Sequence, residues 1–360
     1  MTIIQLIYNL ESGGAEKFVV NLSNQLTDNG HNVIICMLLD DSNPASTFNK
    51  QFLHPNVKFH SMKFSRGFSL KKVMAVHKYI KDQSPDVVHC HLNVIPYIFP
   101  TALFSRQIKF IHTIHSVAEK ASGLKIQRNI NRYFYKHNRI TPITISKECQ
   151  ISFEKYYNLH NIHRIDNGCP TVKPTKELLS VQNEIKKLTK NGDFVFVHVA
   201  RFHPAKNQQL LIDAFNQIYS KNKNFVLLIL GRGFNSNEGK KLQQQSCPNI
   251  FFLGEKNNVG DYLLCADAFC LTSVYEGLPI SLLEAMSCGI TPICTAVGGI
   301  TNVIINKENG YLAEASIESY TNAIKSFMSN VIDPNKIKQS FIQKYSMQTC
   351  ASSYIDVYKD

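Results

Sequence analysis

The sequence predicts two doubly wound α/β domains in series, and three observations support this prediction. Short apolar runs alternate with helical patterns, as in a parallel sheet that helices cover on both faces. The same alternation occurs in both halves, and a polar stretch with Pro170 and Pro174 interrupts it between Gly168 and Lys190. The 360 residues suffice for two domains that each have a core.

The first half, residues 1–170, is predicted to form an N-terminal Rossmann-like domain. From Ala15 to Leu26 the apolar side chains recur at the 3.6-residue spacing of a helix, and Asn29-Gly30 ends this pattern. The apolar runs predict strands at Ile3–Tyr8, Val33–Leu39, Asp86–Cys90, Phe110–Ile114 and Pro142–Ile145.

The second half, residues 171–340, is predicted to form a C-terminal Rossmann-like domain. Helical patterns occur at Gln208–Tyr219 and Pro279–Met286. The segment Ile337–Tyr358 is also helical in character, and we expect residues 341–360 to form a helix that packs back on the N-terminal domain. The predicted strands are Phe194–Val199, Phe225–Leu230, Ile250–Leu253, Ala268–Leu271 and Thr291–Thr295.

The composition is that of a soluble globular protein, with 44% hydrophobic and 18% charged residues. No run reaches the roughly 18 apolar residues of a membrane-spanning helix, and the start of the chain lacks the features of a secretory signal. The ten cysteines form no C-x-x-C pair, which favours buried thiols over a disulfide framework or a zinc site. We therefore expect a cytoplasmic protein.

Ligands of open α/β sheets bind beyond the carboxyl ends of the strands, so the loops after the predicted strands hold the candidate site residues. The first of these loops contains Gly13 and Gly14. Without side chains the backbone can approach a ligand, and the N-terminus of the following helix favours anionic oxygens. A tight turn is the alternative explanation, and Glu16 is explained by the helix dipole.

Two cations follow the predicted strand Phe194–Val199. Arg201 can bind a phosphate through two parallel hydrogen bonds, and Lys206 adds a point charge. The pair therefore suits a diphosphate, whose charge grows when it leaves. A solvated basic loop is the alternative.

A further loop and helix run from Glu276 to Glu284. Gly277 allows an unusual backbone angle, Pro279 suits the first turn of a helix, and the exposed amides there can bind an anion. Glu284 lies on an apolar stretch, where a buried carboxylate needs a partner such as a sugar hydroxyl. A surface glutamate with a capping role is the alternative.

Six segments in order resemble the large family 4 of retaining glycosyltransferases, which have the GT-B fold. The resemblance covers nearly the whole chain and implies two Rossmann-like domains that face a central cleft, the first on the acceptor side and the second binding a nucleotide sugar. The segments are ESGGAEKFVVNLSNQL with NGHNV, PDVVHCHL, FIHTIHS, RIDNGCP, VARFHPAKNQQLLIDAF and EGLPISLLEAMSCGITPICT.

The resemblance also implies a role for each matching residue of the donor site. Arg201 and Lys206 would hold the donor diphosphate and stabilise it as the leaving group. Glu284 would bind the ribose hydroxyls. The transferred sugar and the phosphates would be contacted by Glu276 and by the amides of Gly277 and Leu278.

In the first domain, the resemblance implies that Gly13 and Gly14 close over the donor. It places His115 near the reacting sugar, with His112 as the competing choice because the HTIH segment offers two histidines. Two positions depart from the family pattern. Asn302 stands near the place of a frequent glutamate, and Asn207 replaces a glycine, which we expect to change the backbone but not the charge.

The implied enzyme moves a sugar from a UDP- or GDP-linked donor to a glycan or lipid-linked glycan, as in surface polysaccharide synthesis, and it keeps the configuration at the anomeric carbon. No separate general base is required, because the leaving phosphate can accept the proton of the acceptor. The protein then contributes positioning and charge stabilisation. Asp40-Asp41 is not flanked like an Asp-x-Asp metal motif, so we expect neither a metal nor another cofactor.

The net charge of +12 lies mostly in the first half, where 20 Lys and Arg face 11 Asp and Glu; the second half has 19 against 16. A basic amphipathic helix in the first domain could lie on an anionic membrane, and a solvated helix face is the alternative. The two basic groups are Lys125, Arg128, Arg132, Lys136 and Arg139, and Lys63, Arg66, Lys71, Lys72, Lys78 and Lys81.

Other protein classes fit the sequence less well. A nucleotide-sugar epimerase of the same fold would need an acid and base set that we do not find. For a dinucleotide oxidoreductase, Gly231 and Gly233 supply two glycines of the fingerprint but Ser236 occupies the third place. Because the basic residues form no module with stacking aromatic residues, we expect no nucleic-acid partner. A non-catalytic binder of sugar nucleotides stays open.

Overall fold

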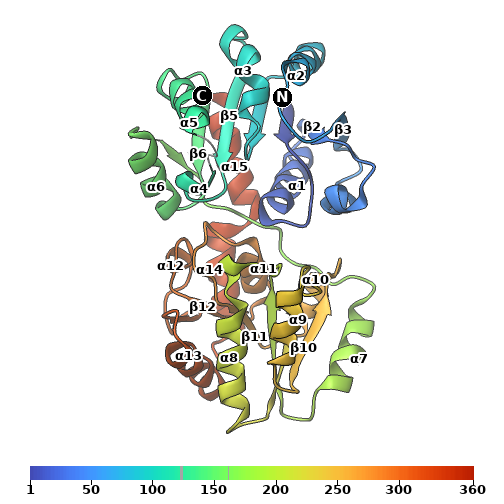
Figure 1. Ribbon diagram of the computed structural model, residues 1–360, viewed down its shortest axis with the longest axis vertical. Helices are drawn as coiled ribbons and strands as arrows, with labels where there is room; N and C mark the ends of the chain where they lie inside the picture. The colour runs from blue at the N-terminus through green and yellow to red at the C-terminus, as the bar shows by residue number, and fades with distance from the viewer. Residues whose placement is uncertain (122–124, 161) are drawn as a thin grey trace. The chain divides into compact units, whose positions relative to one another are not determined.

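A computed structural model of the chain describes residues 1–121, 125–160 and 162–360. The chain divides into two compact units (Figure 1). The N-terminal unit comprises Met1–Cys169 together with Met347–Asp360, and the C-terminal unit comprises Pro170–Ser346. The first division is within one residue of the predicted boundary, whereas the chain returns to the N-terminal unit six residues later than the predicted residue 341.

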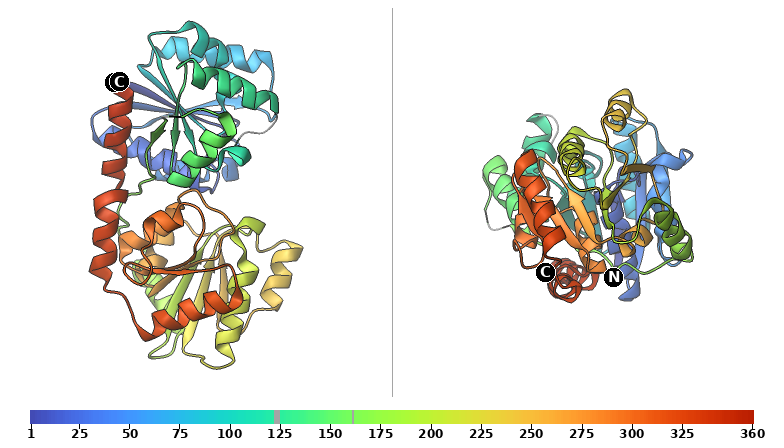
Figure 2. Two further views of the ribbon diagram at one scale, coloured as in Figure 1. Left: turned by 90° about the vertical axis from the view of Figure 1, so that its left-hand side faces the viewer. Right: turned by 90° about the horizontal axis from the view of Figure 1, so that it is seen from below.

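The described part of the N-terminal unit has a seven-stranded parallel sheet with the strand order β3-β2-β1-β4-β5-β6-β7. Figure 2 shows these strands fanned by the usual twist. The strands are β1 (Thr2–Ile7), β2 (Asn32–Leu39), β3 (Lys58–Phe64), β4 (Val87–His91), β5 (Lys109–Ile114), β6 (Thr141–Thr144) and β7 (His163–Arg164). The helices are α1 (Gly14–Asp28), the 3₁₀ helix η1 (Pro44–Phe52), α2 (Leu70–Gln83), α3 (Ile95–Phe104), α4 (Ala118–Ala121), α5 (Lys125–Lys136), α6 (Lys147–Tyr157) and α15 (Met347–Lys359).

The C-terminal unit has a six-stranded parallel sheet with the order β10-β9-β8-β11-β12-β13. Its strands are β8 (Phe194–Val199), β9 (Phe225–Leu230), β10 (Ile250–Gly254), β11 (Ala268–Leu271), β12 (Thr291–Thr295) and β13 (Tyr311–Ala313). Its helices are α7 (Leu178–Leu188), the 3₁₀ helix η2 (Pro204–Lys206), α8 (Gln208–Tyr219), α9 (Asn237–Gln244), α10 (Val259–Leu264), α11 (Ile280–Cys288), α12 (Ile300–Val303), α13 (Ile317–Ser329) and α14 (Pro334–Tyr345).

Both sheets therefore follow the same doubly wound order, in which the first strand of each unit lies between the second and the fourth. The strand order reverses between β1 and β4 in the N-terminal unit, and between β8 and β11 in the C-terminal unit. Ligands of open α/β sheets bind at such a switch point, beyond the carboxyl ends of the strands. The fold thus directs attention to the loops that follow these four strands.

The core strands lie where apolar runs predicted them, because they are buried on both faces; β8, β9, β11 and β12 have the predicted bounds. Three strands were not predicted. The edge strand β3 is only half-buried and alternates polar with apolar residues, while β7 and β13 have two and three residues. No helix in the described residues is long and apolar enough to cross a lipid bilayer.

The helical segment predicted at Ile337–Tyr358 is two helices, α14 and α15, which meet at Ser346. Only α15 belongs to the N-terminal unit. It presents Cys350, Tyr354 and Tyr358 as buried residues, and the tyrosine hydroxyls lie 2.8 Å from Thr113 Oγ1 and 2.8 Å from His89 Nδ1. The helix is therefore tied into the sheet by polar contacts as well as by apolar packing.

Candidate functional site

The loop that follows β8 carries Arg201, and the buried side chains of Gln208 and His198 hold its backbone in place. Gln208 donates a hydrogen bond from Nε2 to the Arg201 carbonyl at 3.0 Å, and the same Nε2 lies 3.3 Å from His198 Nε2. The Nδ1 of His198 lies 2.9 Å from the Cys270 carbonyl on β11. Burial lowers the pKa of His198 to about 4, so the ring is neutral at physiological pH. The Arg201 side chain is exposed beyond this network.

The end of the same loop is held by β11. The Thr272 hydroxyl donates to the carbonyls of Lys206 and Asn207, each at 3.0 Å. Asn207 has φ 48° and ψ 47°, which is the left-handed conformation that glycine adopts easily. The expectation that Asn207 changes the backbone is therefore wrong, because asparagine tolerates this conformation better than other residues with a side chain.

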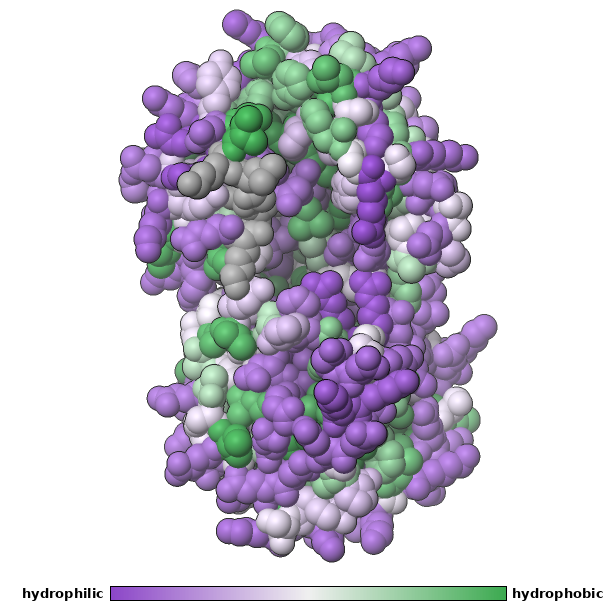
Figure 3. Space-filling view, viewed as in Figure 1, coloured by the Kyte–Doolittle hydropathy of each residue, from purple (hydrophilic) through white to green (hydrophobic). Residues whose placement is uncertain are grey.

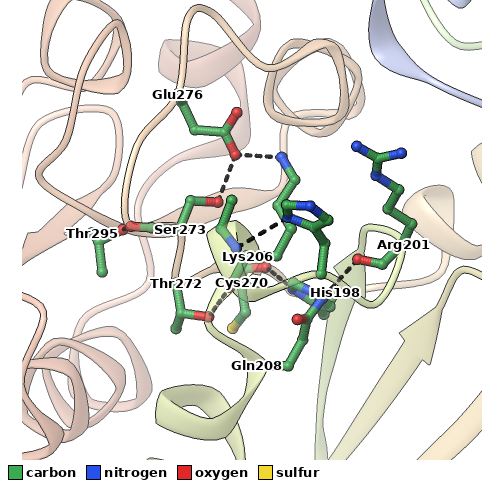
Figure 4. Close-up of polar contacts among 11 residues, drawn as sticks. His198, Arg201, Lys206, Gln208, Cys270, Thr272, Ser273, Glu276 and Thr295 are labelled. Atoms are coloured by element: carbon green, nitrogen blue, oxygen red, sulfur yellow. Dashed lines mark hydrogen bonds and ion pairs between the residues drawn. The ribbon is translucent and has the colours of Figure 1, made fainter. Parts of the chain in front are cut away.

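An ion pair joins the loops after β8 and β11 across the switch point of the C-terminal unit. Lys206 Nζ lies 2.5 Å from Glu276 Oε1, and the Ser273 hydroxyl donates to the same oxygen at 2.5 Å. The lysine side chain is 24% exposed and the glutamate 11%. Figure 4 shows the Arg201 guanidinium extending to the same side as the Lys206 ammonium. The structure thus pairs Lys206 with Glu276, 70 residues further along the chain, on the side to which Arg201 extends.

The backbone of the Glu276 loop packs against the glycines that follow β12. Gly298 has φ 51°, and a Cβ atom added there would lie 2.0 Å from the Glu276 carbonyl oxygen. Gly299 donates from its amide to that carbonyl at 3.4 Å. The unusual backbone angle expected at Gly277 therefore falls on Gly298, since the close approach of two loops requires it there.

The helix α11 begins at Ile280, directly after Pro279 and the buried Leu278. Glu284 lies on this helix and is only 8% exposed, so its carboxylate is in the apolar setting that the sequence indicates. Asn302 lies on α12, where its carbonyl accepts a hydrogen bond from the Tyr345 hydroxyl at 3.2 Å. Gly277, Leu278 and Glu284 thus lie on one continuous segment, formed by the Glu276 loop and the helix α11 that follows it.

A third cation, Arg232, lies in a loop that packs against the Arg201 loop, and it was not predicted as a site residue. A Cβ atom added at Gly231 would lie 2.0 Å from the Ala200 carbonyl oxygen, and the Phe202 amide donates to the Arg232 carbonyl at 2.8 Å. The Gly-Arg-Gly run after β9 thus packs against the Arg201 loop. A cation between two glycines at a strand end is the sequence signal that could have identified it.

In the N-terminal unit, the Gly13-Gly14 loop leads from β1 into α1. A Cβ atom added at Gly13 would lie 2.2 Å from Glu16 Oε2, whereas nothing lies within 4 Å of the corresponding position at Gly14. The carboxylate of Glu16 thus lies against the start of its own helix, which accords with the helix-dipole explanation. Gly14 is the glycine with open space beside it.

The two candidate histidines have different environments. His112 is buried, with Nδ1 2.7 Å from the Tyr135 hydroxyl and Nε2 2.8 Å from the Leu92 carbonyl, so both ring nitrogens serve the core. His115 follows β5, is partly exposed, and has Nε2 3.0 Å from His91 Nδ1. Burial lowers the pKa of both, to about 4 for His112 and about 3 for His115. The structure favours His115 as the histidine that a ligand can reach.

The three arginines of the basic group predicted on and after α5 form hydrogen bonds within the N-terminal unit. Arg128 and Arg132 donate to the carbonyls of Tyr156 and Tyr157, and Arg139 donates to those of Ala102 and Leu103. The side chain of Lys125 lies outside the described part of the structure. These three arginines are thus held by backbone carbonyls of their own unit.

Among the described residues, no group of three or more His, Cys, Asp or Glu side chains could hold a metal ion. A cavity of about 660 Å³ lies at the start of β4, β5 and β6, the opposite edge of the N-terminal sheet from His115. Its lining includes Asp86, Lys109 and Thr141. This cavity is thus distinct from the residues gathered at the carboxyl edge.

The chain matches two family models in succession. Residues 12–173 match the model described as "Glycosyltransferase Family 4", and residues 180–344 match "Glycosyl transferases group 1". Together the two matches cover most of both units and meet near the division between them.

Known proteins of similar sequence and fold point the same way. An uncharacterized glycosyltransferase of Methanocaldococcus jannaschii is 29% identical over 63% of this chain, which spans 59% of that protein's length. The UDP-Gal:alpha-D-GlcNAc-diphosphoundecaprenol alpha-1,3-galactosyltransferase of Escherichia coli is 26% identical over 71% of this chain and 69% of that protein. The crystal structure of Anabaena HepE in complex with UDP and glucose has a TM-score of 0.81 at 18% identity, and covers 100% of this chain and 99% of HepE. The chain therefore belongs to glycosyltransferase family 4, and its fold is GT-B.

Proposed function

We propose that this glycosyltransferase moves a sugar from a nucleotide sugar to a glycan or lipid-linked glycan and retains the configuration of the anomeric carbon. The observation that carries the proposal is the Lys206–Glu276 pair at the switch point of the C-terminal sheet, with the exposed Arg201 beside it. Cations at this edge suit a diphosphate, and a carboxylate among them suits a hydroxyl-bearing group.

Each side chain has a distinct part in the proposed chemistry. Arg201 and Lys206 bind the diphosphate and stabilise the negative charge that develops as it leaves. Lys206 and Ser273 both contact Oε1 of Glu276, so we assign Oε2 to a hydroxyl of the transferred sugar. Glu284 accepts hydrogen bonds from the ribose, and the amides of the α11 first turn contact the phosphates.

The same arrangement supports a reaction without a metal ion or other cofactor. The positive charge that a divalent cation would bring to the diphosphate is supplied by Arg201, Lys206 and the nearby Arg232. We expect transfer to continue in the presence of excess EDTA. A requirement for added Mg²⁺ or Mn²⁺ that EDTA abolishes would contradict this part of the proposal.

We propose a UDP-sugar as the donor. HepE, which shares the fold, binds UDP and glucose, and the Escherichia coli relative is named for transfer from UDP-Gal. The test is a panel of UDP- and GDP-sugars, scored first by the rise in melting temperature, because a bound donor raises apparent stability. The panel is then scored by nucleotide release with and without an acceptor, and the anomeric configuration of the product is read by NMR.

The outcomes separate the competing functions. Nucleotide release that depends on an acceptor supports transfer, and retained configuration supports the proposed stereochemistry. Interconversion of the sugar without an acceptor would indicate an epimerase. Binding without turnover, with equal affinity in wild type and Glu276→Ala, would overturn the enzymatic role of this site.

We also propose that the acceptor lies on an anionic membrane, because the Escherichia coli relative is named for an acceptor on diphosphoundecaprenol. The membrane-facing surface is then the start of α2 rather than α5. Phe68, Leu70 and Met74 are 57%, 67% and 57% exposed there. Figure 3 shows apolar surface over α2 and α3 bordered by hydrophilic surface. The exposed basic residues around this patch are Lys63, Arg66, Lys71, Lys78 and Lys81, whereas Lys72 is bound to the carbonyls of Ser65 and Gly67.

Sedimentation with vesicles tests this surface. The wild type should sediment with vesicles that contain phosphatidylglycerol and much less with pure phosphatidylcholine, since exposed apolar and basic side chains act together. Leu70→Ser with Met74→Ser should abolish sedimentation. The matched control is Ile342→Ser, which replaces an exposed apolar residue of α14. Equal binding by all variants would contradict the assignment.

A further inference from the structure

Three polar side chains form a line across neighbouring strands at the carboxyl edge of the N-terminal sheet. Gln5 lies on β1, His91 ends β4, and His115 follows β5. Gln5 Oε1 lies 2.6 Å from His91 Nε2, and His91 Nδ1 lies 3.0 Å from His115 Nε2. Gln5 and His91 are fully buried, whereas His115 is partly exposed. The line therefore leads from the core to a ring that a ligand can reach.

The amide of Gln5 determines which ring nitrogens of His91 and His115 carry a proton. An amide oxygen only accepts, so the Nε2 of His91 must carry the proton that it donates to Gln5. In a neutral ring the Nδ1 of His91 then has a lone pair, which accepts from the Nε2–H of His115. His115 in turn must carry its lone pair on Nδ1. A single amide orientation thus determines the tautomer of two imidazoles.

The surroundings keep both rings uncharged. The titratable groups around the line are His89, whose ring centroid lies 4.0 Å from that of His91, His112 on β5, and two tyrosines of α15. Tyr354 packs on His89, and Tyr358 hydrogen-bonds to Gln5 and to His89. From α1, the apolar ring of Phe18 packs on His115 at 5.4 Å. Burial, with neighbouring histidines in addition, lowers the pKa of His91 far below its usual value. Neither ring has a carboxylate partner among its described contacts.

We propose that Gln5 and His91 are positioning residues that fix His115 as a neutral imidazole whose Nδ1 accepts a hydrogen bond from a substrate hydroxyl. The inference rests on the proposed function, since that function provides the sugar hydroxyl. A neutral acceptor can bind a hydroxyl without placing a positive charge beside an anomeric carbon that becomes positive as the bond to the diphosphate breaks. Outer partners of this kind commonly set the orientation and tautomer of a working histidine.

The first test does not depend on turnover. Nitrogen-15 NMR of the full chain, labelled at histidine, distinguishes a protonated ring nitrogen from one with a lone pair. His115 should show a lone pair at Nδ1 and a proton at Nε2 throughout the neutral and mildly acidic range. A proton at Nδ1, or a doubly protonated ring near neutral pH, would overturn the proposal even if the protein transfers sugar.

The second test is Gln5→Glu. A carboxylate accepts the same hydrogen bond but favours a proton on His91, and so raises the pKa of the His91–His115 pair. The turnover number should then acquire an acidic limb and fall about tenfold per pH unit below the raised pKa, with a smaller change in KM. The wild type should lack this limb. An unchanged pH profile in Gln5→Glu would contradict the role of Gln5.

Two further variants control for damage to the fold. Gln5→Leu removes the acceptor and should lower the turnover number at every pH, without the acidic limb. His112→Gln disturbs an equally buried histidine that hydrogen-bonds to Tyr135 and Leu92, so it should lower the melting temperature and leave the shape of the pH profile unchanged. If His112→Gln also showed an acidic limb in its pH profile, the limb of Gln5→Glu would be a result of general destabilisation, and the role of Gln5 would be contradicted. If the wild type transfers no sugar, the proposed function fails, and the NMR result still decides the tautomer.

Discussion

The two sheets share one strand order, but their carboxyl edges carry opposite kinds of polar group. In the N-terminal unit the edge holds neutral side chains: His91 ends β4, His89 precedes it on the same strand, and both are buried and linked to neighbouring hydroxyl, amide and imidazole groups. In the C-terminal unit the edge holds charges, with Lys206 paired to Glu276 and Arg201 exposed.

The difference shows that this fold prescribes where a ligand binds and leaves the chemistry to the loop residues. Burial disfavours charge on the histidines, which suits contacts with uncharged hydroxyls. The cations of the other edge remain accessible to water, so they keep the charge that the proposed contact with a diphosphate requires. Each of the following predictions tests one side of this contrast.

Acid should weaken the N-terminal unit first, and this is the largest effect we expect. Burial lowers the pKa of His89, His91, His112 and His115 in the N-terminal unit, and that of His198 in the C-terminal unit. Below the unfolded pKa of about 6.5 the unfolded chain binds protons that the native rings do not, so stability falls as the pH falls. The slope is up to about 1.4 kcal/mol per pH unit for each ring.

Hydrogen exchange of the full chain at decreasing pH measures this effect, after correction for the intrinsic exchange rates. Strands β4 and β5 should lose protection before β8 and β11. Equal loss in the two sheets would show that the buried histidines do not distinguish the units.

Lys206→Met should reduce kcat about 10²- to 10³-fold, the usual cost of removing one group that stabilises a developing charge. The side chain keeps its length, so the loop and Thr272 contacts should survive. Steady-state kinetics with a fixed acceptor give the loss. Lys240→Met, at an exposed position of α9, is the matched control. A similar loss of kcat in both variants would contradict the proposed role of Lys206 in stabilising the leaving group.

Gly298→Ala should damage activity by moving the Glu276 loop. The added methyl would meet the Glu276 carbonyl oxygen at 2.0 Å, and the left-handed backbone costs a residue with a side chain about 1–2 kcal/mol in addition. Gly192→Ala has a φ of 88° but open space, so it isolates the backbone cost. Both should lower the melting temperature, and only Gly298→Ala should lower kcat/KM by at least about tenfold. Equal activity of the two variants would contradict the loop contact.

Substitutions at Asn207 should have the smallest effect, a small change in the free energy of unfolding that depends on the left-handed backbone at this position. Asn207→Gly should change the free energy of unfolding by only a few tenths of a kcal/mol, because both residues accept the left-handed backbone. Asn207→Ala should cost about 1 kcal/mol for the same reason. Urea denaturation of the two variants measures the difference. If alanine and glycine proved equal there, the backbone of this loop would not be left-handed in solution.

Runs of apolar residues predicted the central strands correctly, because a strand that is buried on both faces must consist mostly of apolar residues. Edge strand β3 escaped detection since one face needs no apolar residue, and β7 and β13 are too short for a pattern. Motif order predicted Arg201, Lys206 and Glu276 as site residues. The ion pair between Lys206 and Glu276 depends on β8 lying beside β11, and strand order is a property that local sequence does not encode.

Two other details of the site depend on contacts between distant segments. The periodicity of α5 revealed its basic face, but the carbonyls that bind Arg128 and Arg132 belong to α6, which no spacing rule connects to them. The left-handed glycine that packs against the Glu276 loop is Gly298, which follows β12 rather than β11. Sequence thus located the chemistry-bearing residues better than it identified their partners.

The helix α15 has a consequence for the order in which the chain folds during synthesis. Its tyrosine hydroxyls complete contacts with Thr113 and His89 inside the first sheet, yet it follows the entire C-terminal unit in the sequence. The C-terminal unit is one continuous segment and can close as soon as residue 346 has left the ribosome. The N-terminal unit, although most of it is made first, cannot complete its contacts until residues 347–360 have also left the ribosome.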